Sequence, residues 1–176
     1  GFGPVMPGFV YVPFNDLAAA DQAIGPKTAA VMVEGIQGEG GVIPATAEYL
    51  LGLRKMTQER GVSLLMDSVQ CGHYRTGRFQ SYELILEKAG KKDEFLPDAV
   101  SMAKSLGGGF PVGAVWFGKK LQDVLVPGSH ATTYGGTALA CAVALEILKI
   151  IEEEKLAENI FVRGEELKKG LAQLAG

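Results

Sequence analysis

Three residues whose side chains could do chemistry each end a short apolar run of the sequence: Glu34, Asp67 and Lys104. Lys104 is followed by residues 105–109, Ser-Leu-Gly-Gly-Gly, so the backbone there can bend sharply and approach a ligand closely. A lysine amine in that setting can form an imine with a carbonyl compound. Ligands of open α/β sheets bind where strands end and loops begin. We therefore expect the three side chains to meet at one edge of a sheet.

Each of these residues also has an ordinary structural interpretation. Lys104 could be an exposed lysine at a junction between a strand and a loop, as most lysines are exposed. Asp67 could cap a helix or a turn, and Val69 could be a core residue. The glycines of Gly38–Gly41 favour a turn over a phosphate cradle, because this spacing alone is a weak signal.

The hydrophobic pattern predicts the elements that must position these side chains. Continuous apolar runs predict buried strands at residues 29–34, 62–67, 99–103 and 113–117. Helical spacing predicts helices at residues 46–60, 137–154 and 156–174, and a polar helical excursion on the surface at residues 79–97. Strand, helix and strand in succession imply a parallel crossover. The expected fold is α/β, with a mostly parallel sheet and flanking helices.

Composition narrows the class of protein. A chain of 176 residues that is 47% apolar can bury one core, so we expect one domain. The net charge of -3 comes from scattered charges, which argues against nucleic-acid binding. We find no run that could span a membrane and no leader sequence, and we expect a cytoplasmic protein. No metal-ligand spacing joins Cys71, Cys141, His73 and His130, so we expect no metal site and reduced thiols.

Several stretches, taken together and in order, resemble the class III aminotransferases: residues 33–42, 65–72, 75–77, 101–109 and 130–136. Within that family, residues 37–45 are most similar to the acetylornithine and ornithine subgroup. The resemblance implies the large domain of the fold type I transferases that use pyridoxal 5′-phosphate (PLP). It further implies that residues 1–176 are a fragment, the central part of that PLP-binding domain, with residues 155–176 leading toward a small C-terminal domain.

The resemblance assigns cofactor roles to five residues. Lys104 would form the imine with PLP and move protons, while Asp67 would hold the proton on the pyridine nitrogen. Val69 would stack on the ring, and Gln70 would contact its phenolic oxygen. Thr133 resembles the threonine that reaches the PLP phosphate of the neighbouring subunit, which implies a homodimer with shared active sites.

Two acidic residues take substrate-related roles by the same resemblance. Glu39 is similar to the glutamate that pairs with an arginine and helps to choose between amino donor and acceptor, and Glu34 would support the strand end. The implied reaction is a ping-pong transfer of the amino group of N-acetylornithine, or a similar ω-amino acid, to 2-oxoglutarate in arginine biosynthesis. An aminomutase with the same cofactor core is one alternative. A non-catalytic dimerisation module is another.

The sequence also departs from the family pattern. The family's phosphate loop, the aromatic residue over the ring and the substrate-carboxylate arginine lie outside these 176 residues. We therefore expect the isolated chain to bind PLP weakly and not to turn over. Residues 79–97 are longer than is usual in the family, and the substituted positions are Gly35 (usually Pro), Ser68 (usually Glu), His73-Tyr74 (often Met-Gly) and Thr137-Ala138 (usually Asn-Pro).

Overall fold

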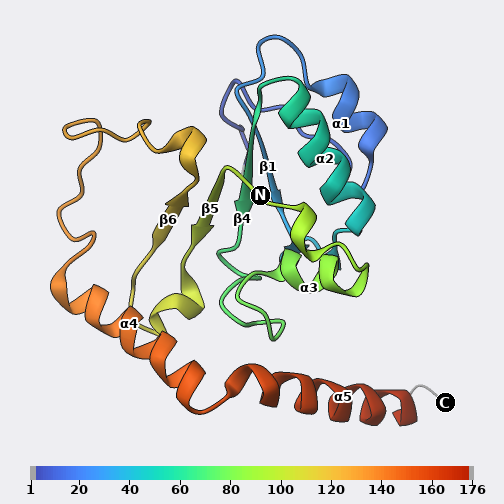
Figure 1. Cartoon of the computed structure of the whole chain (residues 1–176), viewed down its shortest axis with the longest axis vertical. Helices are drawn as coiled ribbons and strands as arrows, with labels where there is room; N and C mark the ends of the chain where they lie inside the picture. The colour runs from blue at the N-terminus through green and yellow to red at the C-terminus, as the bar shows by residue number, and fades with distance from the viewer. Residues whose placement is uncertain (1–2, 175–176) are drawn as a thin grey trace.

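The computed structural model describes residues 3–174 and is built around a sheet whose order is β1-β4-β5-β6 (Figure 1). β1 and β4 are parallel, as are β4 and β5, whereas β6 runs antiparallel to β5. All four predicted strands are confirmed, and so is the mostly parallel sheet. Their bounds are β1 Ala30–Glu34, β4 Ser63–Asp67, β5 Ala99–Met102 and β6 Ala114–Phe117.

Helices and short turns connect these strands. The helices predicted near residues 46–60, 137–154 and 156–174 are confirmed as α2, α4 and α5. A helix at residues 17–23 and a small hairpin at residues 36–44 were not predicted. The remaining bounds are α1 Leu17–Ala23, β2 Ile36–Gln37, β3 Ile43–Pro44, α2 Ala47–Glu59, α3 Ser81–Lys88, η1 Lys92–Glu94, η2 Lys104–Gly107, η3 Lys119–Leu121, α4 Ala138–Glu153 and α5 Leu156–Leu174.

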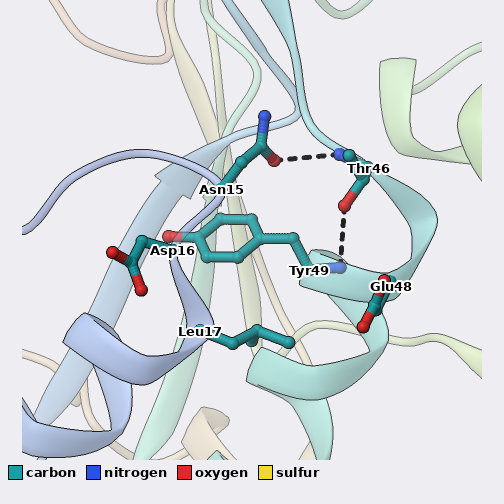
Figure 2. A pocket seen from close by; sticks show the side chains of 6 residues that line it. All are labelled: Asn15, Asp16, Leu17, Thr46, Glu48 and Tyr49. Atoms are coloured by element: carbon teal, nitrogen blue, oxygen red, sulfur yellow. Dashed lines mark hydrogen bonds between the residues drawn. The ribbon is translucent and has the colours of Figure 1, made fainter.

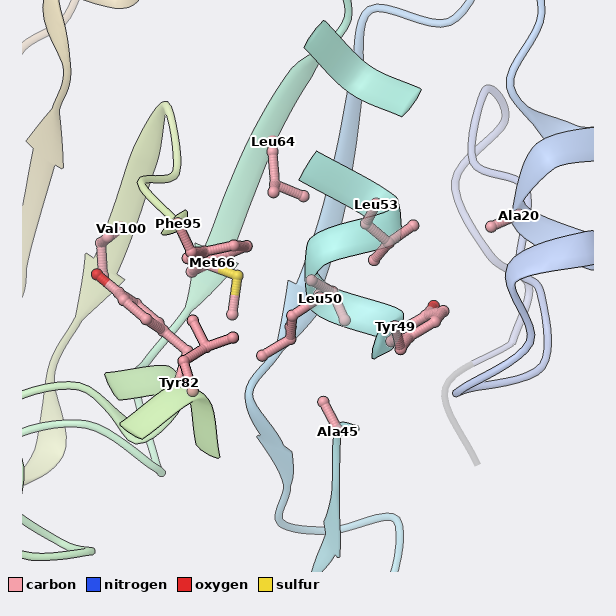
Figure 3. Packing of buried hydrophobic residues seen from close by; sticks show 12 residues of the cluster. Ala20, Ala45, Tyr49, Leu50, Leu53, Leu64, Met66, Tyr82, Phe95 and Val100 are labelled. Atoms are coloured by element: carbon pink, nitrogen blue, oxygen red, sulfur yellow. The ribbon is translucent and has the colours of Figure 1, made fainter. Parts of the chain in front are cut away.

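The core lies between one face of the sheet and the helices α2 and α3 (Figure 3). Leu50 and Leu53 of α2 and Leu64 and Met66 of β4 are each 0% exposed. Thr46 caps the start of helix α2, and its hydroxyl accepts a hydrogen bond from the backbone N–H of Tyr49 at 3.0 Å. Because alternate residues of β4 are locked into this core, the orientation of Asp67 at its end is fixed.

The other face of the sheet is more open than the sequence indicated. The run at residues 29–34 was expected to be buried on both faces, but Met32 is 58% exposed and only Val33 of β1 is buried. Val115 of β6 is 53% exposed. The expectation was wrong for these two strands because both lie at the ends of the sheet order, and the core residues contact one face only.

Residues 79–97 are not simply a surface excursion. Ser81, Tyr82 and Leu86 of α3 are buried, and the rings of Tyr82 and Phe95 pack with centroids 5.1 Å apart. The charged part, residues 87–94, is exposed. The prediction of a polar surface segment is therefore wrong for α3, since its apolar side faces the core.

Helix α5 extends along the lower edge of the molecule in Figure 1, and none of its residues is buried. It contacts α4, and Phe161 lies against Gly77. The guanidinium carbon of Arg78 sits 4.8 Å from the Phe161 ring centroid, a cation–π contact. Within residues 3–174, no helix is both long and apolar enough to cross a bilayer.

Candidate active site

The carboxyl ends of β1, β4 and β5 bring acidic and hydroxyl side chains onto one face of the sheet. The parallel ladders pair Glu34 with Asp67 and Asp67 with Ser101. Paired residues of neighbouring strands point to the same side. Lys104 begins η2 shortly after β5 ends at Met102, so the chain itself delivers the lysine to this edge.

The carboxylate of Asp67 is held through one of its two oxygens. Oδ1 accepts hydrogen bonds from the backbone N–H of Val69 at 2.9 Å and from the hydroxyl of Ser101 at 3.3 Å. The Asp67 Oδ2 atom accepts no hydrogen bond from any residue between 3 and 174. This oxygen can therefore accept a hydrogen bond from a donor group of a ligand at the sheet edge.

The hairpin β2–β3 folds onto the loop that follows Asp67. The carboxylate of Glu34 accepts a hydrogen bond from the backbone N–H of Gly38 at 3.3 Å, and the amide of Gln70 donates to Glu39 at 3.2 Å. A Cβ atom at Gly38 would lie only 1.4 Å from Oε1 of Gln70. Glycine at this position thus lets the hairpin approach Gln70, while Gly38–Gly41 forms the turn that the sequence favoured.

Lys104 is exposed, and its backbone has a positive φ of 46°. The turn that it starts continues into Gly108 and Gly109, whose φ values are 55° and 114°. A Cβ atom at Gly108 would meet Ile147 of α4 at 2.5 Å, so this helix packs closely on the lysine turn. Lys104 forms no hydrogen bond or ion pair with Asp67 in the described part of the chain.

The structure brings together most of the residues that the sequence singled out, but not all. Glu34, Glu39, Asp67 and Gln70 are linked through the hairpin and the strand ends, together with Val69 through its backbone. Thr133 stands apart: it is exposed on the loop between β6 and α4, and none of the described side-chain hydrogen bonds involves it. Its expected partner is another subunit.

The sequence reasoning did not identify Ser101, although the hydroxyl of this residue contacts the candidate carboxylate. Its position opposite Asp67 follows from the pairing of β4 with β5, three residues before Lys104. Side-chain alternation along residues 99–102 would have placed Ser101 and Ala99 on one face. Only the register between the strands identifies its neighbour, and register comes from the tertiary structure.

Two of the family substitutions have local explanations. A Cβ atom at Gly35 would lie 2.3 Å from the hydroxyl of Ser81 of α3, so a larger residue here would have to displace that hydroxyl. Thr137 caps α4 by accepting from the N–H of Ala140 at 3.4 Å, with Ala138 as the first helical residue. Asn-Pro suits the same two positions, since Asn caps helices and Pro favours their first residue.

His73 is a buried histidine next to the Asp67 loop. It is 4% exposed, has a positive φ of 51°, and neither ring nitrogen has a hydrogen-bond partner in the described structure. Burial lowers the pKa of His73 below its ordinary value. The ring packs edge-to-face on Phe79, with centroids 5.1 Å apart. These contacts hold the His73 ring against Phe79.

A surface hollow of about 360 Å³ lies away from these residues, between the start of α1 and the start of α2 (Figure 2). Asn15 bridges the two segments by donating to the carbonyl of Pro44 at 3.1 Å and accepting from the N–H of Thr46 at 3.0 Å. Burial, and then the charge of Asp16, raises the pKa of the Tyr49 phenol that lines it. The polar groups here cap and join helices. Among residues 3–174, no cluster of three or more His, Cys, Asp or Glu could hold a metal ion.

Comparison with known proteins identifies the family. The model of the family "Aminotransferase class-III" matches residues 1–176. An acetylornithine aminotransferase of Gloeobacter violaceus is 44% identical over 174 residues, which cover 98% of this chain and 41% of the relative. The acetylornithine aminotransferase of Methanocaldococcus jannaschii is 43% identical over 164 residues, covering 93% of this chain and 39% of the relative. This chain therefore spans about two fifths of the length of the curated relatives.

Solved structures agree with this assignment. An ornithine aminotransferase from Toxoplasma gondii, described with partial occupancy of PLP at its active site, superposes with a TM-score of 0.84 and 36% identity, over 98% of this chain and 39% of that one. The acetylornithine aminotransferase of Elizabethkingia anophelis gives a TM-score of 0.83 and 34% identity, over 98% and 42% of the two chains. The expected fold is confirmed, and the chain belongs to the class III aminotransferase family.

Proposed function

We propose that the protein to which this chain contributes is a PLP-dependent aminotransferase in which Lys104 forms the covalent link to the cofactor. The observation that carries the proposal is the half-satisfied carboxylate of Asp67 at the end of β4, beside the strand that leads to Lys104. PLP, when bound, withdraws electrons from the reacting carbon of an amino acid, provided that its ring nitrogen is protonated. A fixed carboxylate with one free oxygen can accept a hydrogen bond from that protonated nitrogen and so stabilise the proton on it.

Each residue of the candidate site has a role in this proposal. Oδ2 of Asp67 holds the ring proton, Val69 packs on the ring face, and Gln70 donates to the phenolic oxygen. Lys104 is exposed and follows the end of β5, so its amine can reach a carbonyl and, once released, can move a proton at the substrate carbon. The hydrogen bond between Gln70 and Glu39 joins the proposed cofactor contact to the proposed substrate contact, so a movement of one side chain would displace the other.

We further propose N-acetylornithine, or ornithine as a close second, as amino donor and 2-oxoglutarate as acceptor, in arginine biosynthesis. The similarity to acetylornithine aminotransferases at 44% and 43% identity supports this choice. Glu39 stands at the exposed tip of the hairpin, where it can pair with an arginine supplied from outside this chain. That pair would distinguish a donor with a distant amino group from 2-oxoglutarate, which carries a second carboxylate.

The assembly that we propose is a homodimer with shared active sites. Thr133 lies exposed on a loop, takes part in none of the described side-chain hydrogen bonds, and would reach the cofactor phosphate of the partner subunit. Residues 1–176 would form the central part of the PLP-binding large domain. Helix α5, which buries none of its residues here, would lead toward the small domain. Cys71 and Cys141 are free thiols, which fits a cytoplasmic location.

The test is a transamination assay on the full-length protein with N-acetylornithine, ornithine and an amino aldehyde as alternative substrates. We expect glutamate to form from 2-oxoglutarate with N-acetylornithine or ornithine, and Lys104→Ala to lower kcat by more than about 1,000-fold because it removes the nucleophile and proton carrier. Isomerisation of the amino aldehyde without a 2-oxo acid would instead identify an aminomutase. A full-length protein that binds PLP but transforms none of these compounds would contradict the proposal.

A further inference from the structure

We infer that Ser101 is a positioning residue for the cofactor carboxylate: its hydroxyl holds Oδ1 of Asp67, so that Oδ2 is directed toward the ring nitrogen. This inference rests on the proposed function, since it assumes that Asp67 faces PLP. Its basis is the hydrogen bond from the Ser101 hydroxyl to Oδ1 at 3.3 Å, together with the register that places the two residues opposite each other.

A carboxylate with a single hydrogen bond can still rotate about its own axis. The backbone N–H of Val69 supplies one donor to Oδ1 at 2.9 Å, from the same loop as Asp67. Ser101 supplies the second donor from the neighbouring strand, and two donors from different segments fix the plane of the carboxylate better than one. A hydrogen bond to the N–H of a rigid ring requires a fixed orientation of the carboxylate, since hydrogen bonds weaken steeply as their angle departs from linearity.

Ser101 also holds the backbone beside the carboxylate. Its carbonyl accepts a hydrogen bond from the N–H of Ser68 at 2.9 Å. The main chain of Ser101 therefore fixes the start of the loop, and its side chain fixes the carboxylate. A substitution by alanine removes only the second contact, because any residue supplies the carbonyl. The same strand continues to Lys104, so Ser101 connects the two principal residues of the proposed site.

The experiment measures the dissociation constant of PLP for the full-length protein by absorbance titration, in five variants and the wild type. Ser101→Ala should bind PLP roughly threefold to tenfold more weakly, the loss expected for a hydrogen bond to a charged group at the long end of the distance range. Ser101→Thr keeps the hydroxyl and should restore most of the affinity. In an Asp67→Ala background, adding Ser101→Ala should change the affinity by less than about twofold, because the group that it positions is gone.

The matched control is Ser63→Ala. Ser63 is a buried serine at the opposite end of β4, on the same sheet face as Asp67, and makes no contact with that carboxylate. The Ser63→Ala variant should bind PLP with the same affinity as the wild type. Urea unfolding of both alanine variants shows whether general loss of stability contributes.

Two results would overturn the inference while leaving the proposed function standing: wild-type affinity in Ser101→Ala, or an equal loss of affinity with and without the Asp67 carboxylate. The second result would show that the serine acts on the fold and not through Asp67. A wild-type protein that binds no PLP would overturn both the proposed function and this inference, and is recognised before any variant is compared.

Discussion

Lys104 has a backbone conformation that few lysines adopt. Its φ of 46° falls in the left-handed region, where an L-residue with a Cβ atom is strained. Such strain is found preferentially at functional positions and persists where surrounding contacts enforce it. Here α4 packs on Gly108 and the turn of η2 fixes the chain. A lysine in this strained conformation is consistent with the proposed role of its amine.

Comparing two substitutions at Lys104 separates backbone strain from chemistry. Lys104→Ala and Lys104→Gly both remove the amine, but glycine accepts a positive φ without a steric penalty. We expect the glycine variant of the full-length protein to be more stable than the alanine variant by about 1 kcal/mol in urea unfolding without PLP. Neither variant should transaminate. Equal stability, or a more stable alanine variant, would show that this residue is not strained in the folded protein.

Stability at acidic pH should depend on His73. Burial lowers its pKa in the folded protein below the ordinary 6.5, so between these two values the unfolded chain binds the proton and the folded chain does not. The contribution of neutral His73 is complete above about pH 6.5 and is lost as the pH falls below it, by at most about 1.4 kcal/mol per pH unit.

The measurement is urea unfolding of the full-length protein at a series of pH values from about 5 to 8. His73→Asn keeps a residue type that tolerates a positive φ and should flatten the curve below pH 6.5. His130→Asn, which replaces an exposed histidine, should keep the dependence of the wild type. If both variants lose stability with acid as steeply as the wild type, His73 is not the group responsible.

The hairpin β2–β3 links Glu34 and Glu39, the residues proposed to serve the substrate, to the loop after Asp67, which is proposed to hold the cofactor. It is held by Glu34, which accepts from the N–H of Gly38, and by the hydrogen bond between Gln70 and Glu39. The close approach at Gly38 makes these contacts possible, because any side chain there would occupy the place of the Gln70 amide. The hairpin and the Asp67 loop are therefore expected to respond together to a change in either one.

Gly38→Ala tests this coupling. The added methyl group should displace the end of the Gln70 side chain and break its bond to Glu39, which weakens PLP binding roughly fivefold. Because only a flexible side chain must move, the free energy of unfolding should change by less than about 1 kcal/mol. In the control, Gly40→Ala, the nearest atom is Oε1 of Gln37 at 3.1 Å. A PLP affinity equal in the two variants would contradict the coupling.

The positions of helices and strands could be predicted from the sequence better than the contacts between them. Apolar runs located β4 and β5 and placed Asp67 and Lys104 at strand ends, because length and periodicity are local signals. The same signal could not show that the side chain of Met32 is exposed, or that Tyr82 and Phe95 pack toward the core from a segment rich in charged residues. Nor could it pair Ser101 with Asp67. Burial and register depend on which strands and helices meet, and residues far apart in sequence decide that.

At the scale of the whole molecule, the chain spans about two fifths of the length of its curated relatives, and the complete active site as proposed draws on a second subunit. Thr133 and Lys104 lie on different segments that no described hydrogen bond connects. In a homodimer with shared sites, each active site would contain Lys104 of one subunit and Thr133 of the other. In closed two-fold symmetry each subunit makes the same contribution to its partner.

Mixing two variants that each lack one residue of the proposed site tests whether that site is shared. Dimers that combine one Lys104→Ala subunit with one Thr133→Ala subunit contain one site with both wild-type residues and one with neither. Random reassembly of equal amounts should therefore restore about one quarter of the wild-type sites, measured as transaminase activity at a PLP concentration that fills wild-type sites but not sites that lack Thr133. The separate variants, treated in the same way, serve as controls. No recovery on mixing would mean that each site takes both residues from a single subunit.

Whether Lys104 binds the cofactor covalently is tested by incubating the full-length protein with PLP, recording its visible absorbance, reducing it with borohydride and mapping the modified peptide. We expect a visible band that reduction fixes to Lys104, and a Lys104→Ala variant that has neither the band nor the label. Label on another lysine, or the same band in the Lys104→Ala variant, would contradict it.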